Sequence, residues 1–305
     1  KSPTEITDAL MVEDIRGAAD VFAPVYARTK GGDGYVSIEV SPVYAADTAM
    51  TVREAHRLWR AVARPNLMVK IPATPAGVPA IEQCIADGLN INVTLIFSLR
   101  RYDEVMEAYL AGLSRRLGAG RPVARIASVA SFFVSRVDSA VDAQLEERCK
   151  GVSAEDRRLL ERWKGRAAIA NAKLAYARYR EIFSGARWEA LAATGARTQR
   201  CLWASTSTKN PDYSDILYVA DLIGPDTVNT MPEETIRAFQ DHGAPEATLE
   251  RDLDAAHAVF ADLAKAGVDY DDVSALLERE GVEKFEASFA QLLQGIVARR
   301  EALLA

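Results

Sequence analysis

Short apolar segments alternate with longer amphipathic ones along most of this chain, and this alternation limits the folds open to it. Six runs have the length and composition of buried strands, centred near residues 38, 69, 93, 129, 202 and 228. Stretches with helical periodicity separate them, which predicts a parallel sheet covered by helices. No GxGxxG loop follows the first strand, so the nucleotide-binding signature of a Rossmann fold is missing.

The expected helices follow from the apolar spacing and from the residues that bound each stretch. Ser2 or Thr4 could cap a first helix through Val12, and Thr51 reads as the N-cap of a later one. Further helices are expected over 14–27, 51–62, 77–87, 99–117 and 213–223, with three between 138 and 197. The last 70 or so residues read as helical, with breaks at Gly243, Gly267 and Gly281.

Polar side chains inside the expected strands distinguish between two kinds of parallel sheet. They are Glu39, Lys70, Asn92, Thr94, Ser131 and Asn229. A doubly wound sheet has helices on both faces and little room for them, whereas the interior of a (β/α)8 TIM barrel accommodates them near its C-terminal rim. A closed barrel has eight strands, and only six are evident. We therefore expect residues 1–305 to form one barrel domain, N-terminally incomplete by two βα units, with a helical insertion at 138–198 and extra C-terminal helices at 232–305.

One strand carries a lysine among apolar neighbours, in the sequence Leu67-Met-Val-Lys70-Ile-Pro72. A buried lysine must lose its charge or find partners. A neutral amine is a nucleophile that forms a Schiff base with a carbonyl substrate. The alternative is that Lys70 caps the strand and extends to water, and this stretch alone does not decide between the two.

The neighbouring strands supply groups that suit imine chemistry. Glu39, Asn92 with Thr94, and Ser131 lie on three other strands of the first four, so a barrel would bring them together with Lys70. A carboxylate can hold or deprotonate a water, and amide and hydroxyl groups can bind the hydroxyls of a substrate. The alternative is a polar ladder that satisfies itself inside the barrel.

Two sites have the composition of anion-binding sites. Arg136 follows the fourth strand directly, and the loop Trp203-Ala-Ser205-Thr-Ser-Thr-Lys209-Asn-Pro211 follows the fifth. Phosphate sites in barrels commonly use loops after late strands, and arginine and lysine are natural phosphate partners. The alternative for Arg136 is a surface ion pair with Asp138 or Asp142.

Composition excludes several classes of protein. The net charge of −6, from 37 basic and 43 acidic residues, argues against a nucleic-acid-binding protein. No apolar run approaches the roughly 20 residues that span a membrane. Three distant cysteines offer no disulfide framework or CxxC pair, which suits a reducing cytoplasm, and the three histidines match no metal-ligand spacing. We expect no metal and no cofactor.

Several motifs occur together in a familiar order. They are LMVKIPAT at 67–74, NINVTLIFS at 90–98, SVASFFVSRVD at 128–138, LWAST at 202–206, TVNTMP at 227–232 and GVEKF at 281–285. Over nearly the whole chain the sequence resembles transaldolases, most closely the long form of actinobacteria and cyanobacteria. The resemblance implies a (β/α)8 barrel of the class I aldolase type. It also implies a metal-free transferase of the pentose phosphate pathway that moves a dihydroxyacetone unit from a ketose phosphate to an aldose phosphate.

The resemblance also implies a role for each matching residue. Lys70 matches the Schiff-base lysine, Glu39 and Thr94 match the pair that holds the catalytic water, and Asn92 and Ser131 match residues that bind dihydroxyacetone hydroxyls. Phe133 matches an aromatic residue at the mouth of the site, and Arg136 and Ser205 match phosphate-binding residues. Lys209 stands near the place of a second phosphate-binding arginine, which this chain lacks.

The chain departs from the family pattern at its start. The family's acid/base aspartate on the first strand and its Thr-Thr-Asn-Pro-like segment on the second are absent, and Asp33 and Asp47 are poor substitutes. Two alternatives therefore stay open: a related aldolase that uses free dihydroxyacetone, and an inactive barrel that only binds sugar phosphates. The C-terminal helices could cover the barrel or form the face of a homodimer.

Overall fold

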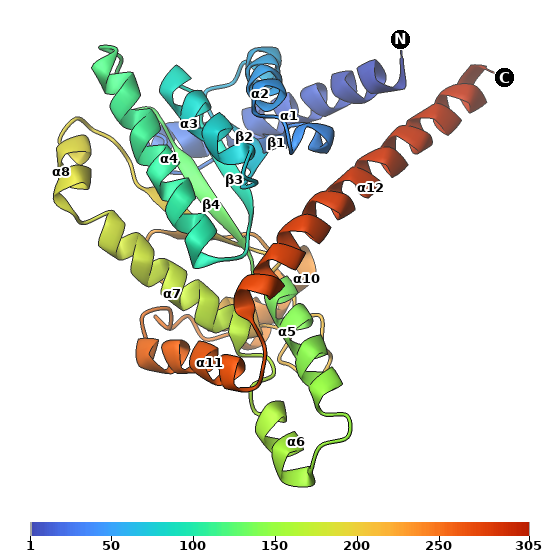
Figure 1. Ribbon diagram of the computed structural model, residues 1–305. Helices are drawn as coiled ribbons and strands as arrows, with labels where there is room; N and C mark the ends of the chain where they lie inside the picture. The colour runs from blue at the N-terminus through green and yellow to red at the C-terminus, as the bar shows by residue number, and fades with distance from the viewer. Residues whose placement is uncertain (1, 305) are drawn as a thin grey trace.

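The computed structural model describes residues 2–304, and its centre is a six-stranded parallel sheet (Figure 1). The strands pair with their neighbours in chain order, from β1 to β6. Their bounds are β1 (Val36–Glu39), β2 (Leu67–Pro72), β3 (Ile91–Ile96), β4 (Ser128–Phe133), β5 (Gln199–Ala204) and β6 (Thr227–Asn229). The expected α/β fold and all six strand positions are confirmed. Within this part of the chain β1 and β6 are the sheet edges, so closure into an eight-stranded barrel stays a prediction.

Helices precede, connect and follow the strands of the sheet. They are α1 (Pro3–Arg28), η1 (Pro42–Tyr44), α2 (Thr48–Val62), α3 (Gly77–Asp87), α4 (Leu99–Gly118), α5 (Val134–Arg148), α6 (Ala154–Glu161), α7 (Ala167–Ile182), α8 (Ala186–Ala192), α9 (Leu217–Ala220), α10 (Glu233–His242), α11 (Leu253–Lys265) and α12 (Tyr270–Leu304). In Figure 1, α11 lies along α7, and α12 crosses the molecule and carries the C-terminus to the side where the N-terminus lies. None of the described helices is long and apolar enough to cross a membrane.

Five helix predictions need correction, and four of them concern where helices begin, end or divide. The first helix is continuous from Pro3 to Arg28 and is capped by Ser2, whose hydroxyl oxygen accepts from the Glu5 amide. The second helix begins three residues earlier than predicted because Asp47 caps it, while the Thr51 hydroxyl donates to the Tyr44 carbonyl. Four helices, not three, lie between β4 and β5, and only Leu217–Ala220 of the predicted 213–223 helix is helical.

Gly281 does not break the last helix, contrary to the sequence prediction. A Cβ atom at this position would lie 3.0 Å from Cδ2 of Leu95 on β3. The glycine therefore allows α12 to approach the sheet closely, because a helix tolerates glycine where packing requires the space.

Alternation along each strand separates a core face from a cavity face. On β2, Leu67, Val69 and Ile71 are fully buried against the outer helices. Met68 and Lys70 point the other way and line a cavity on the inner side of the sheet. Because the strands are parallel and adjacent, inward residues of several strands meet around this cavity.

Candidate active site

The inner face of the sheet borders a cavity of about 450 Å³. Four residues singled out from the sequence line it: Glu39, Lys70, Asn92 and Ser131. They come from four successive strands, β1 to β4, as the strand alternation predicted. The pairing register places Lys70 opposite Glu39 on one side and opposite Asn92 on the other.

Lys70 and Glu39 form an ion pair inside this cavity. Lys70 Nζ lies 3.6 Å from Glu39 Oε2, and each side chain is about one-quarter exposed, at 24% and 25%. Burial raises the pKa of Glu39, and the nearby Lys70 charge opposes this rise. The lysine thus has the charged partner that a buried amine requires, and the carboxylate is a base next to a nucleophile.

Asn92 connects polar groups of three strands. Its Nδ2 donates to the Ser37 hydroxyl on β1 at 3.1 Å, and its Oδ1 accepts from the Ser131 hydroxyl on β4 at 2.7 Å. Ser37 was missed at the sequence level, although it lies two residues before Glu39 and therefore shares its face of β1. The three side chains present hydroxyl and amide groups beside the lysine.

Thr94 lies two residues beyond Asn92, at the C-terminal part of β3, opposite Pro72 of β2. Its side chain is fully buried, and its hydroxyl oxygen has no hydrogen-bond partner among the described protein groups. An unpaired buried hydroxyl is costly, so such groups in native proteins usually have a functional or solvent partner.

Two aromatic rings lie side by side next to the lysine. The Lys70 Nζ lies 6.0 Å from the ring centre of Phe133 and 5.5 Å from that of Phe285. The two rings meet edge to face, with their centres 6.5 Å apart. Phe133 was expected near the site, whereas Phe285, on α12, was missed as a site residue. Its only signal was its place in the GVEKF motif.

Arg136 lies on the outer side of Phe133, in the first turn of α5. Its guanidinium carbon is 4.8 Å from the Phe133 ring centre, and its buried Nη1 has no partner among residues 2–304. Burial lowers the pKa of Arg136, and the nearby Glu280 opposes this shift. The side chain lines a second cavity of about 620 Å³ between α5 and α12.

The expected alternative for Arg136, an ion pair with a neighbouring aspartate, is absent from the described residues. Asp138 accepts hydrogen bonds from the Ala168 amide and the Tyr218 hydroxyl. Asp142 accepts from the Gly165 amide and the Tyr213 hydroxyl. Both carboxylates are occupied by structural partners, which leaves the arginine available for an anion.

The loop after β5 places its two candidate residues differently. Ser205 has a left-handed backbone (φ 56°), and its hydroxyl lies 2.9 Å from the hydroxyl of Ser135. Ser135 directly precedes Arg136 in the sequence. Lys209 is exposed, donates to the Ser207 hydroxyl at 2.6 Å, and lines neither cavity. The structure thus brings Ser205 close to the start of α5, and a phosphate-binding role for Lys209 stays a prediction.

The described residues show no group of three or more His, Cys, Asp or Glu side chains arranged to hold a metal ion. The groups gathered around the cavity are an amine, a carboxylate, an amide and hydroxyls. Together they can form an imine with a carbonyl compound, move protons and hold a polyhydroxylated substrate.

Comparison with known proteins gives a consistent result. A family model described as transaldolase/fructose-6-phosphate aldolase matches residues 1–296. A transaldolase of Acidothermus cellulolyticus is 52% identical over 303 residues, which are 97% of this chain and 79% of that protein. Transaldolases of Saccharopolyspora erythraea (54% identity, 94% and 76%) and Trichodesmium erythraeum (48% identity, 97% and 79%) are also similar.

Proposed function

The chain belongs to the transaldolase/fructose-6-phosphate aldolase family, as a transferase of the transaldolase type, and we propose that it transfers a dihydroxyacetone unit through a Schiff base on Lys70. The observation that carries this proposal is the Lys70–Glu39 pair at 3.6 Å in a polar cavity. The donor is a ketose phosphate such as sedoheptulose 7-phosphate or fructose 6-phosphate. The acceptor is glyceraldehyde 3-phosphate or erythrose 4-phosphate.

The proposed reaction begins when the neutral Lys70 amine attacks the C2 carbonyl carbon of the donor. Loss of one water gives an imine between C2 and Nζ. Removal of the C4 hydroxyl proton then breaks the C3–C4 bond and releases an aldose phosphate. The electron pair of the broken bond stays on the dihydroxyacetone unit, as an enamine. The enamine C3 attacks the aldehyde carbon of the acceptor, whose oxygen takes a proton, and water hydrolyses the new imine to free Lys70.

Other residues receive roles in the same proposal. Glu39 exchanges protons with the water lost and regained at the imine, and the unpaired Thr94 hydroxyl holds that water. Asn92 and Ser131 bind hydroxyl groups of the dihydroxyacetone unit. Arg136 and Ser205 bind the phosphate, with Phe133 between the phosphate-binding side and the lysine, and Lys209 is the weaker candidate for a second cation.

The test is to trap the Schiff base. Sodium borohydride added with fructose 6-phosphate should add a reduced dihydroxyacetone unit to the peptide that contains Lys70, detected by mass spectrometry. Lys70→Met should abolish the adduct and transfer activity, because no other amine replaces the nucleophile. Lys265→Met is the matched control, since Lys265 is an exposed lysine paired with Asp262 on α11.

Each alternative has its own outcome in this experiment. An adduct on another lysine would overturn the proposal. An adduct with release of free dihydroxyacetone and no transfer to an acceptor would identify an aldolase. Binding of fructose 6-phosphate without adduct or turnover would identify a barrel that only binds sugar phosphates.

Location and assembly are separate proposals. A cytoplasmic location is supported by three cysteines that are all buried and unpaired, and a fluorescent fusion of the chain would test it.

A homodimer is supported by large apolar side chains exposed on two outer helices. They are Leu10, Val21 and Phe22 on α1 and Leu292 and Leu303 on α12.

A further inference from the structure

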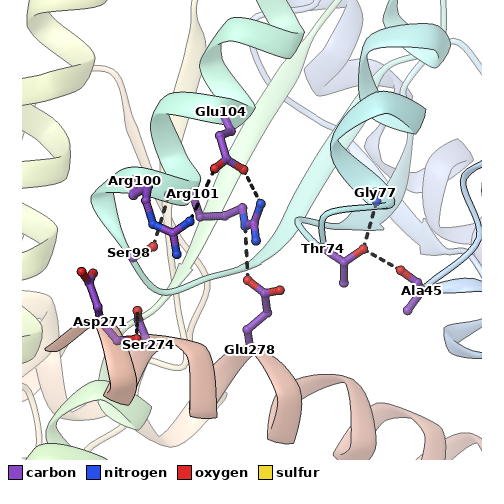
Figure 2. Close-up of polar contacts among 10 residues, drawn as sticks. All are labelled: Ala45, Thr74, Gly77, Ser98, Arg100, Arg101, Glu104, Asp271, Ser274 and Glu278. Atoms are coloured by element: carbon purple, nitrogen blue, oxygen red, sulfur yellow. Dashed lines mark hydrogen bonds and ion pairs between the residues drawn. The ribbon is translucent and has the colours of Figure 1, made fainter. Parts of the chain in front are cut away.

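The first half of α12 contacts the C-terminal end of β3 and the start of α4 (Figure 2). Arg101, near the start of α4, donates from Nε to Glu278 of α12 at 3.2 Å. The Arg101 side chain is only 11% exposed and also pairs with Glu104. An ion pair this shielded is costly to break, so it holds α12 firmly in one position.

Two more contacts position the same helix against β3. The Tyr270 hydroxyl donates to the Phe97 carbonyl at 2.8 Å, just beyond the strand. Gly281 faces Leu95, where a Cβ atom would already approach within 3.0 Å. Leu95 has a left-handed backbone (φ 59°) within the irregular part of the β3–β4 pairing. The helix is thus held at its first residue, at Glu278 and at Gly281.

Phe285 follows Gly281 by four residues and lies on the same side of α12. This geometry carries its ring to 5.5 Å from Lys70 Nζ, edge to face with the ring of Phe133. Beyond it, Phe289 and Leu292 line an apolar cavity of about 220 Å³ that also borders Glu39. The lysine therefore has a polar cavity on one side and an aromatic cover on the other.

We propose that α12 is a cover for the Lys70 site, and that Phe285 keeps bulk water away from the enamine so that the enamine reacts with an acceptor before it is protonated and hydrolysed. This inference rests on the Schiff base proposed above and concerns what happens after C–C cleavage. The enamine on Lys70 has two fates. Its C3 can form a bond to an acceptor aldehyde, or it can take a proton and be hydrolysed by one water, which releases dihydroxyacetone and the free amine.

The cover acts on the second fate. This fate begins with transfer of a proton to C3 of the enamine, and an apolar ring beside Lys70 removes space and hydrogen-bond partners for the bulk water that would supply this proton. The one water held by Glu39 and Thr94 stays in place to hydrolyse the product imine. The acceptor can still enter through the polar cavity, which lies on the other side of the lysine. Arg101 is a positioning residue in this scheme, because it acts on Phe285 only through Glu278 and the helix.

The experiment measures how the adduct divides between the two fates. Each variant is supplied with fructose 6-phosphate, with and without glyceraldehyde 3-phosphate, and both transfer product and free dihydroxyacetone are quantified. Phe285→Ala should raise the ratio of release to transfer roughly tenfold, the factor that corresponds to about 1.4 kcal/mol between competing barriers. Phe285→Leu should restore most of the wild-type ratio, because it restores apolar bulk.

Two further variants separate the cover from general damage to the fold. Arg101→Met should shift the ratio in the same direction but less, since the other two contacts still hold α12. Gln294→Ala, at an exposed position of the same helix, should leave the ratio unchanged. Borohydride trapping on each variant reports whether Lys70 still reacts.

The outcomes distinguish the two proposals. If wild-type protein forms no Lys70 adduct, the proposed function fails and the inference fails with it. If the adduct forms and Phe285→Ala lowers transfer and release equally, Phe285 has only a structural role and the inference alone is overturned. If Phe285→Ala does not fold, an unchanged ratio in Arg101→Met overturns it as well.

Discussion

At the scale of single residues, the groups around the candidate site divide into those with partners and those without. Asp138 has partners on two helices: it accepts from the Ala168 amide on α7 and from the Tyr218 hydroxyl on α9. It is 1% exposed, and this burial raises its pKa to about 7, while the two hydrogen bonds oppose the rise. Arg136 Nη1 and the Thr94 hydroxyl, by contrast, have no partner among the described groups. The paired residues stabilise the fold, and the unpaired ones are available to a ligand.

The raised pKa of Asp138 predicts a pH dependence of stability. Between its ordinary pKa of 3.8 and about 7, the folded protein holds a proton that the unfolded chain has lost. Asp138 therefore increases the free energy of unfolding at low pH. This contribution is lost as the pH rises through 7. The loss is at most about 4 kcal/mol, from 1.36 kcal/mol for each of roughly three pKa units.

Asp138→Asn should remove this dependence, because asparagine stays neutral and can keep hydrogen bonds to both partners. Urea unfolding at pH 5 and pH 8 measures it: the variant should lose less stability between these two values than the wild type does. Glu39, whose pKa is also raised, contributes equally to both proteins and cancels in the comparison. Identical pH slopes in the two proteins would contradict the prediction.

At the scale of elements, close approach between helices depends on small residues at particular points. α3 and α4 pack on each other beside the sheet, and Gly112 of α4 lies at their contact. A Cβ atom there would be 2.8 Å from the Glu82 carbonyl oxygen and 2.8 Å from Ile85. Gly118, at the end of the same helix, has no such neighbour within 4 Å. Alanine at Gly112 would therefore test both packing and helix propensity, whereas alanine at Gly118 would test helix propensity alone.

We expect Gly112→Ala to destabilise the protein by about 1–3 kcal/mol, the usual cost of forcing an extra methyl group into a packed contact. Gly118→Ala has the same chemistry but open space, so it should be neutral or stabilising by up to about 1 kcal/mol. Chemical denaturation of the two variants and the wild type measures the difference. Equal stability of the two variants would show that α3 and α4 do not pack as closely as the geometry indicates.

At the scale of the whole molecule, a few side chains join segments that are distant in the sequence. The buried Asn66 amide donates to the carbonyls of Ala19 on α1 and Gly34 before β1. Arg197 donates to the carbonyls of Lys30 and Gly31. The remaining outer faces of α1 and α12 keep exposed apolar side chains, including Val21 at 74% and Leu303 at 74%.

These exposed apolar side chains lead to the prediction for assembly. Sedimentation velocity should give a mass of twice 33.2 kDa, because pairing would remove apolar surface from water. Val21→Glu combined with Leu303→Glu should shift the population to monomer without loss of helical content. A monomer at all concentrations in the wild type would rule out the homodimer.

The sequence by itself determined the strand order and most of the lysine site. Inward and outward residues alternate along a strand, and successive parallel strands are neighbours, so Glu39, Lys70, Asn92 and Ser131 were placed on one face by local pattern alone. Helix boundaries were predicted less accurately where two residues could each act as the N-cap, as with Asp47 and Thr51. The site roles inferred from these positions remain predictions that the trapping experiment tests.

The tertiary structure alone decided what covers that site. Gly281 looks like a helix break in the sequence, but its missing side chain lets α12 pack against Leu95. Phe285 then reaches Lys70 through contacts with residues far away in the chain, at Arg101 and Phe97. Local sequence determines the period of a strand, whereas the position of a helix across a sheet depends on non-local packing, which only the folded chain contains.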